Sequence, residues 1–222
     1  MNIEEVMTTA VAALKVAGIA EQRLEAVSLL SFVLERDRTF LHAHPEHELS
    51  DSELNAFHKA VERRSGREPL QYITGRQEFW RLEFVVTADV LIPRPETEIL
   101  VEAAIELLDD LPSPRFCEVG TGSGCIAVSI LHSVNNASAI ATDISPAALL
   151  VAGTNAMRHG VRDRLELHNA SIFDTVTGRF DLIVSNPPYI SDADIASLDA
   201  EVRDHEPFIA LAGGSGGLDI IW

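Results

Sequence analysis

The spacing of apolar residues defines three successive regions along this chain. In the first region, apolar positions recur every three or four residues, as in residues 3–17, which is the period of an amphipathic helix. Gly18 follows that segment as a helix-ending residue. The segment Ser50-Asp51-Ser52-Glu53 has the form of a capping box and predicts the start of another helix. We therefore expect residues 1–73 to form a small all-α domain.

A different period follows in residues 77–86, where apolar and charged side chains alternate. The apolar positions are Trp80, Leu82, Phe84 and Val86. A period of two places alternate side chains on opposite faces of a strand. We expect a small β-hairpin here, within a linker of residues 74–93.

From residue 94 onward, strand-length apolar runs alternate with helical segments. The predicted strands are residues 115–119, 137–142, 165–168 and 180–185. Such alternation predicts a parallel, three-layer α/β domain of Rossmann type over residues 94–222, with ligands bound beyond the carboxyl ends of the strands. Gly120, Asp143 and Asn186 each follow one of these strands directly.

The first of these strand ends carries the segment Gly120-Thr121-Gly122-Ser123-Gly124, with a helix expected directly after it. Glycines there permit a tight turn and close approach of a ligand to the backbone. Asp143 lies 19 residues beyond Gly124 (143 − 124), at the end of the next strand, where a carboxylate can accept both ribose hydroxyls. The pattern is Gly-x-Gly-x-Gly, and the turn has no lysine or arginine for a phosphate. A nucleoside without phosphates, such as S-adenosylmethionine, therefore fits better than a dinucleotide.

The last of these strand ends carries Asn186-Pro187-Pro188-Tyr189. Each proline fixes its own φ and pushes the preceding residue out of the helical region, so Asn186 and Pro187 are held extended. The Asn186 side-chain oxygen and the Pro187 carbonyl are then two free acceptors beside the flat ring of Tyr189. Two acceptors next to an aromatic ring suit a planar –NH₂ group. The alternative is an ordinary turn after a strand.

Together these residues resemble a class I methyltransferase that acts on an amino or amide nitrogen. More narrowly, the chain resembles the peptide chain release factor glutamine methyltransferases. Three further segments match that family in its own order: Pro69-Leu70-Gln71-Tyr72-Ile73-Thr74-Gly75, Ile92-Pro93-Arg94-Pro95-Glu96-Thr97-Glu98 and Glu206-Pro207-Phe208-Ile209-Ala210-Leu211. The resemblance covers nearly the whole chain.

The resemblance implies methyl transfer from S-adenosylmethionine to the side-chain amide nitrogen of a glutamine in a release factor. The cofactor-binding residues that it implies are Glu118, Gly120, Thr121, Gly122, Gly124, Asp143, Ile144, Ser171 and Asn186. The catalytic residues would be Asn186, Pro187 and Tyr189, and the substrate would contact Asn186, Pro187, Pro188, Tyr189, Arg94 and Glu98. For Arg94 and Glu98, a salt-bridging surface pair is the alternative. No metal is implied, and the helical domain would recognise the release factor.

The chain departs from the family's pattern at two places. Ser171 stands where the family usually has an acidic residue for the adenine amino group, with Asp174 a little downstream. The family's sheet also continues beyond the region resembling residues 213–218. We therefore expect the methyltransferase domain to be incomplete at its C-terminus. The apolar strand at residues 180–185 would then have a free edge that favours association with another chain.

Composition bears on the partner and the compartment. The net charge is 17 − 34 = −17, and residues 74–222 alone carry 9 basic and 22 acidic residues, which gives −13. This balance disfavours a phosphate-binding track, and with it nucleic acid as a direct substrate. The start of the chain has no signal-peptide pattern, no membrane span is expected, and the only cysteines, Cys117 and Cys125, have no metal-type spacing. These features favour the cytoplasm.

Three alternatives to release-factor methylation remain open. One is a glutamine methyltransferase for a ribosomal protein. Another is a nucleic-acid amino-methyltransferase, since an exocyclic base –NH₂ is also planar. The third is a non-catalytic binding module that holds the nucleoside or a partner without turnover, because its sheet is incomplete.

Overall fold

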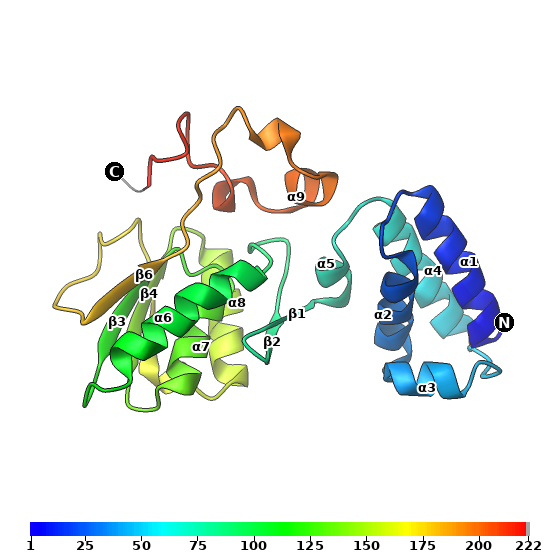
Figure 1. Cartoon of the computed structure of the whole chain (residues 1–222), viewed down its shortest axis with the longest axis horizontal. Helices are drawn as coiled ribbons and strands as arrows, with labels where there is room; N and C mark the ends of the chain where they lie inside the picture. The colour runs from blue at the N-terminus through cyan, green and yellow to red at the C-terminus, as the bar shows by residue number, and fades with distance from the viewer. Residues whose placement is uncertain (221–222) are drawn as a thin grey trace. The chain divides into compact units, whose positions relative to one another are not determined.

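The chain forms two compact units, residues Met1–Thr74 and Gly75–Trp222, in a computed structural model that describes residues 1–220 (Figure 1). The first unit contains helices and the second contains both a hairpin and a parallel sheet. Each unit has its own hydrophobic core. We describe the two units separately.

The first unit contains five helices around one apolar core. They are α1 (Ile3–Val16), α2 (Gln22–Leu34), α3 (Arg38–Ala43), α4 (Asp51–Ser65) and α5 (Leu70–Thr74). The predicted capping box is confirmed, because the Ser50 side chain accepts from the Glu53 N–H while the Glu53 carboxylate accepts from the Ser50 N–H. Gly18 has a φ of 75°, as expected after a helix end. Leu14, Leu30 and Phe57 are fully buried between the helices.

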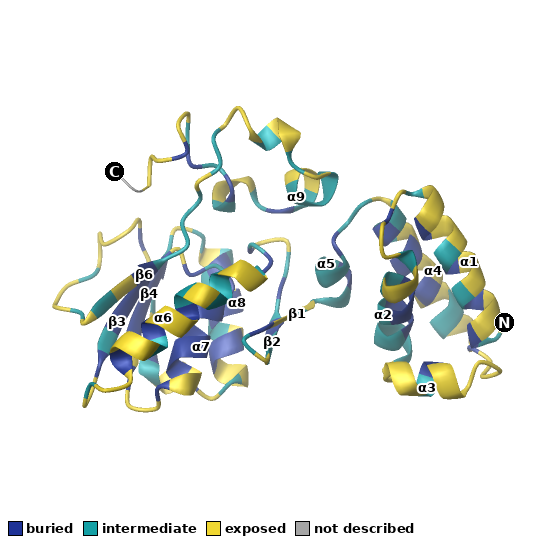
Figure 2. Ribbon diagram, in the orientation of Figure 1, coloured by how far each residue is buried: buried dark blue, intermediate teal, exposed yellow. Residues whose placement is uncertain are grey.

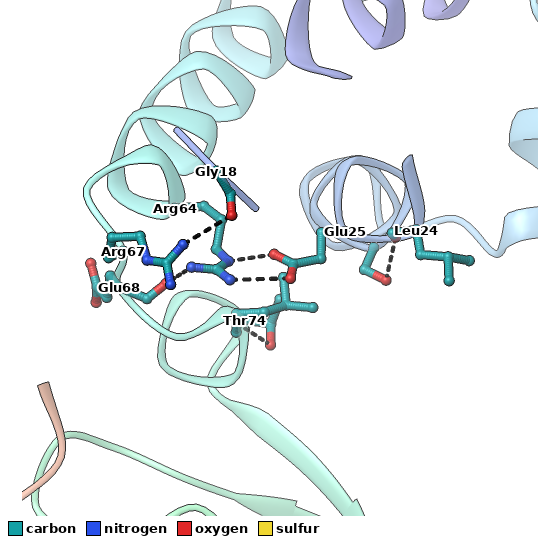
Figure 3. A network of polar contacts seen from close by, with 9 residues as sticks. Gly18, Leu24, Glu25, Arg64, Arg67, Glu68 and Thr74 are labelled. Carbon is teal, nitrogen blue, oxygen red and sulfur yellow. Dashed lines mark hydrogen bonds and ion pairs between the residues drawn. The ribbon is translucent and has the colours of Figure 1, made fainter. Parts of the chain in front are cut away.

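A polar network ties α4 to the rest of this unit (Figure 3). The buried guanidinium of Arg64 makes a two-pronged ion pair with Glu25 on α2 and donates to the Glu68 carbonyl at 3.3 Å. Arg67 donates to the Gly18 carbonyl at 3.2 Å. A buried guanidinium needs such partners because an unpaired buried charge is costly. These charges therefore hold helices together.

The second unit begins with the predicted hairpin, which is confirmed. Its strands β1 (Arg76–Phe79) and β2 (Leu82–Val85) pair antiparallel. The turn residues Trp80 and Arg81 have φ of 52° and 59°, which is unusual for residues other than glycine. The Trp80 N–H donates to Glu98 Oε1 at 2.8 Å, which helps to hold this turn.

The main sheet has four parallel strands in the order β5-β4-β3-β6. They are β3 (Arg115–Val119), β4 (Ser138–Asp143), β5 (Leu165–Asn169) and β6 (Leu182–Ser185). The strand prediction is confirmed, although β6 begins two residues later than expected. Among the described residues β6 pairs only with β3, so it is an edge strand, and Ile183 is 54% exposed there.

Three helices, α6 (Glu98–Leu108), α7 (Cys125–Ser133) and α8 (Pro146–Arg158), lie side by side on one face of this sheet. Figure 2 shows α7 largely buried, whereas α6 and α8 expose their outer sides. Right-handed crossovers that run in one direction from β3 to β4 to β5 place their helices on the same face. The expected third layer is therefore wrong for the described residues, because no helix lies between β5 and β6.

The chain after β6 forms three short helical elements among the described residues. Its elements are η3 (Ile195–Ser197), α9 (Ala200–His205) and η4 (Phe208–Ala210). An isolated parallel bridge joins Ile190 to Ala212. In the part of the chain that the structure describes, no helix is both long and apolar enough to cross a bilayer.

Candidate active site

The carboxyl ends of β3, β4 and β6 border a cavity of about 220 Å³. Gly120 and Asn186, which directly follow β3 and β6, and Asp143, the last residue of β4, all line it. Parallel strands bring their carboxyl ends to one edge of a sheet, so residues distant in sequence converge there. Ile144 and Ser171 lie on the same cavity.

The glycine turn presents bare backbone to this cavity. Gly120 and Gly122 have φ of 71° and 54°, and a Cβ added to either would meet no atom within 4 Å. The Gly120 and Thr121 N–H groups both donate to the Thr142 carbonyl, at 2.9 and 3.0 Å. Gly124 does not line the cavity. A Cβ there would lie 3.1 Å from Ala152 of α8, so Gly124 permits close packing of this helix against the turn.

Asp143 is held in place by backbone N–H groups from two elements. Its Oδ2 accepts from the Gly122 N–H at 2.8 Å, and its Oδ1 accepts from the Ser145 N–H at 2.9 Å. A carboxylate oxygen can accept more than one hydrogen bond, so both oxygens can still receive a hydroxyl. Asp143 is only partly buried and borders the cavity.

Glu118 of β3 lies beneath the glycine turn and is fully buried. Its Oε2 accepts from the Thr121 hydroxyl at 2.7 Å and from the Ala127 N–H at 3.2 Å, while Oε1 has no partner within the described residues. Burial raises the pKa of Glu118 to about 8, the two hydrogen bonds oppose this rise, and the charge of Asp143 adds to it. Glu118 does not line the cavity. It supports the turn from below, and its burial favours the protonated form of the carboxyl.

Glu118 should make stability depend on pH. Its folded pKa of about 8 lies above the ordinary 4.5, so the folded protein keeps a proton that the unfolded chain releases. The resulting stabilisation is complete below about pH 4.5 and is lost as the pH rises through about 8. Chemical unfolding between about pH 5 and about pH 9 should show wild type losing stability relative to Glu118→Gln, which cannot titrate. A pH-independent difference between the two proteins would contradict the buried-acid assignment.

Asn186 also lines a second cavity, of about 460 Å³. Pro187 and Tyr189 line this cavity, and Tyr189 is 63% exposed. The two cavities share five lining residues, which are Leu91, Arg94, Thr97, Asn186 and Ala210. Asn186 therefore stands where two ligands could meet.

Arg94 lies at the cavities, whereas Glu98 does not. Arg94 lines both cavities and forms an ion pair with Glu206, whose carboxylate is buried and also accepts from the Ile92 N–H at 3.4 Å. Burial raises the pKa of Glu206, and the Arg94 guanidinium opposes this rise. Glu98 lines neither cavity. Its carboxylate binds the Trp80 N–H of the hairpin, and its role in substrate binding stays a prediction.

The glycine-rich segment 213–217 packs directly on the Asn-Pro-Pro-Tyr turn. The Gly213 N–H donates to the Ile190 carbonyl at 2.9 Å, and the Ile190 N–H donates to the Leu211 carbonyl at 3.1 Å. A Cβ on Gly213 would lie 2.8 Å from the Pro188 carbonyl oxygen, and one on Gly217 would lie 2.5 Å from that of Tyr189. The backbone of this glycine-rich segment therefore packs directly against the backbone of the Asn-Pro-Pro-Tyr turn.

Gly217→Ala should destabilise the second unit by about 1 to 2 kcal/mol, because Gly217 has a left-handed φ of 73° and its new Cβ would press on Tyr189. Chemical unfolding monitored by circular dichroism measures the change. Gly216→Ala in the same segment is the matched control, since a Cβ there would meet no atom within 4 Å. Equal stabilities of the two variants would show that this packing is unimportant.

Several residues that shape the site were not predicted from the sequence. The amide of Asn155 accepts from the Val85 N–H at 2.8 Å and donates to the Val85 and Ser123 carbonyls, which ties β2 to the glycine turn. Thr97 binds the Asn186 side chain, and Glu206 binds Arg94. Thr97 and Glu206 lie within segments that matched the family, which was the available signal. Nothing in the local sequence marks Asn155.

The fold and the site define the class of protein. A family model described as "Methyltransferase small domain" matches residues 96–202, and one described as "PrmC N-terminal domain" matches residues 5–75. The fold is shared with the solved hMettl16 catalytic domain in complex with the MAT2A 3'UTR hairpin 6, at a TM-score of 0.53 and 17% identity, over 73% of this chain and 60% of that one. The chain is thus a methyltransferase of the α/β class.

The particular family follows from curated relatives. A release factor glutamine methyltransferase of Moorella thermoacetica is 44% identical over 99% of this chain and 77% of its own length. One from Geobacter sulfurreducens is 46% identical over 91% of this chain and 70% of its own length. The chain belongs to the release factor glutamine methyltransferase family.

Proposed function

We propose that this chain transfers a methyl group from S-adenosylmethionine to the side-chain amide nitrogen of a glutamine in peptide chain release factors. The observation that carries the proposal is the position of Asn186, on the wall shared by the two cavities. Membership in the family supplies the substrate class. The same proposal places the reaction in the cytoplasm.

The residues of the first cavity fit the cofactor. Open space above Gly120 and Gly122 admits a ligand close to the backbone, and the carboxylate of Asp143 can accept ribose hydroxyls. Ile144 offers an apolar side chain for an adenine ring, and Ser171 offers one hydroxyl for its amino group. S-adenosylmethionine supplies an electrophilic methyl group on a sulfonium.

The second cavity holds the substrate amide. A glutamine amide nitrogen is a weak nucleophile because its lone pair is delocalised into the carbonyl. Acceptance of its two hydrogens by Asn186 Oδ1 and the Pro187 carbonyl would orient the nitrogen and stabilise positive charge as it develops there. The methylated nitrogen is then acidic enough to release a proton without a dedicated base. Tyr189 would pack on the amide plane.

The helical unit is proposed to hold the release factor while its glutamine occupies the second cavity. This unit matches the family's N-terminal domain. Its buried polar network, centred on Arg64, serves helix packing (Figure 3). The exposed side chains of this unit would therefore recognise the release factor.

The proposal is tested by incubating the chain with radiolabelled S-adenosylmethionine and a purified bacterial release factor. Label should enter the release factor and should not enter duplex DNA, RNA or a ribosomal-protein fraction supplied in parallel. Transfer to one of those instead would replace the proposed substrate. Titration of S-adenosylmethionine by calorimetry separates loss of cofactor binding from a wrong substrate. Cofactor binding without any transfer would favour the non-catalytic alternative.

A further inference from the structure

We propose that Thr97 is a positioning residue for methyl transfer, because its hydroxyl accepts a hydrogen bond from the Asn186 amide and so leaves Asn186 Oδ1 directed at the substrate. Asn186 Nδ2 lies 3.2 Å from Thr97 Oγ1. The inference rests on the proposed function, since it concerns the same acceptor. Its two residues are 89 positions apart in the sequence.

The backbone of Thr97 is itself fixed. Thr97 ends the short helix η1 (Pro95–Thr97) and immediately precedes α6. Its N–H donates to the Arg94 carbonyl at 3.0 Å. Pro95 at the start of η1 restricts the entry to this turn. The hydroxyl is therefore presented from a constrained segment rather than from a free loop.

Asparagine requires such a partner because its amide has two ends of nearly equal size and opposite hydrogen-bonding character. The substrate –NH₂ is a donor, so only Oδ1 of Asn186 can bind it. When Oδ1 faces the substrate, Nδ2 faces Thr97, and an acceptor there satisfies it. Without the hydroxyl, this working orientation leaves a half-buried donor unpaired, which is costly.

The hydrogen bond between Thr97 and Asn186 also lies where the cofactor and the substrate are expected to meet. Thr97 and Asn186 are two of the five residues that line both cavities. A change in the direction of the Asn186 amide would therefore act where cofactor and substrate meet. It would disturb the chemical step more than the binding of either ligand.

The test compares Thr97→Val, which keeps the shape of the side chain and removes the hydroxyl, with Thr97→Ser, which keeps the hydroxyl. Valine should lower kcat for the release factor by about tenfold to a hundredfold, with little change in the Kd for S-adenosylmethionine. Serine should restore most of the rate. If the valine variant folds poorly, Thr97→Ala serves in its place.

A double-mutant cycle tests whether Thr97→Val lowers the rate through Asn186. In an Asn186→Ala background, Thr97→Val should cause little further loss, because the amide that it orients is gone. Equal losses in both backgrounds, or an undiminished kcat in Thr97→Val, would overturn the proposal. So would a serine variant as slow as the valine variant.

A substrate-independent readout separates this inference from the proposed function. The side-chain amide protons of Asn186, assigned by their loss in Asn186→Ala, should exchange with solvent faster in Thr97→Val than in wild type or Thr97→Ser. Unchanged exchange would overturn the pairing even if methyl transfer occurs. A release factor that receives no methyl group would refute the proposed substrate, while the exchange data would still decide the role of Thr97.

Discussion

Asn186→Ala should reduce methyl transfer by about two to four orders of magnitude, the largest effect expected of any single change here. The substitution removes the side-chain oxygen that accepts one hydrogen of the substrate amide. It leaves the Pro187 carbonyl in place. Because this oxygen acts on the developing charge, the loss should fall on kcat rather than on cofactor affinity. Single-turnover kinetics with saturating S-adenosylmethionine measures the rate.

Asn186→Asp provides a control for shape, since it keeps an oxygen in the same place and replaces the amide that binds Thr97. Calorimetry should show that both variants bind S-adenosylmethionine within a few-fold of wild type. A near wild-type rate for Asn186→Ala would refute the pair of acceptors. If the affinity for S-adenosylmethionine fell as much as the rate, Asn186 would be assigned to cofactor binding and not to the chemical step.

Asp143→Ala should weaken S-adenosylmethionine binding by about 1.5–3 kcal/mol, which is roughly a tenfold to hundredfold rise in Kd. The variant loses hydrogen bonds from a carboxylate to ribose hydroxyls. It also releases the Gly122 and Ser145 N–H groups that Asp143 now holds, so the glycine turn is less ordered. Isothermal titration calorimetry measures the change.

Asp143→Asn separates the effect of the carboxylate's charge on the ribose from its effect on the order of the glycine turn. One oxygen remains to hold a backbone N–H, while the charge is lost. Its Kd should lie between those of wild type and Asp143→Ala. Asp174, which lies outside the cavity lining, offers a matched control, and Asp174→Ala should leave the Kd unchanged. Unchanged affinity in a folded Asp143→Ala protein would remove Asp143 from the cofactor site.

The sequence predicted those parts of the fold that depend on local patterns. The helix caps, the hairpin period and the four parallel strands each follow from residues close together in the chain. The convergence of Gly120, Asp143 and Asn186 was predictable too, because parallel strands share one carboxyl edge. Strand order and the number of layers depend on crossovers, and a two-sided sheet was wrongly expected where β5 leads to β6 without a helix.

Side-chain partners were harder to predict because they depend on the three-dimensional packing. Arg94 and Glu98 are four residues apart, so pairing between them was a reasonable hypothesis. The chain instead brings Glu206 to Arg94 and directs Glu98 to the Trp80 N–H. The Thr97 contact with Asn186 likewise joins two segments that no periodic pattern relates.

The most direct test of the proposed reaction is the site of methylation in the product. Release factor treated with this chain and S-adenosylmethionine should be digested and sequenced by tandem mass spectrometry. One added methyl group on a glutamine side-chain nitrogen is the predicted result, and it should disappear when that glutamine is replaced by alanine. A methyl group on a different residue type, or on nucleic acid with none on the release factor, would contradict it.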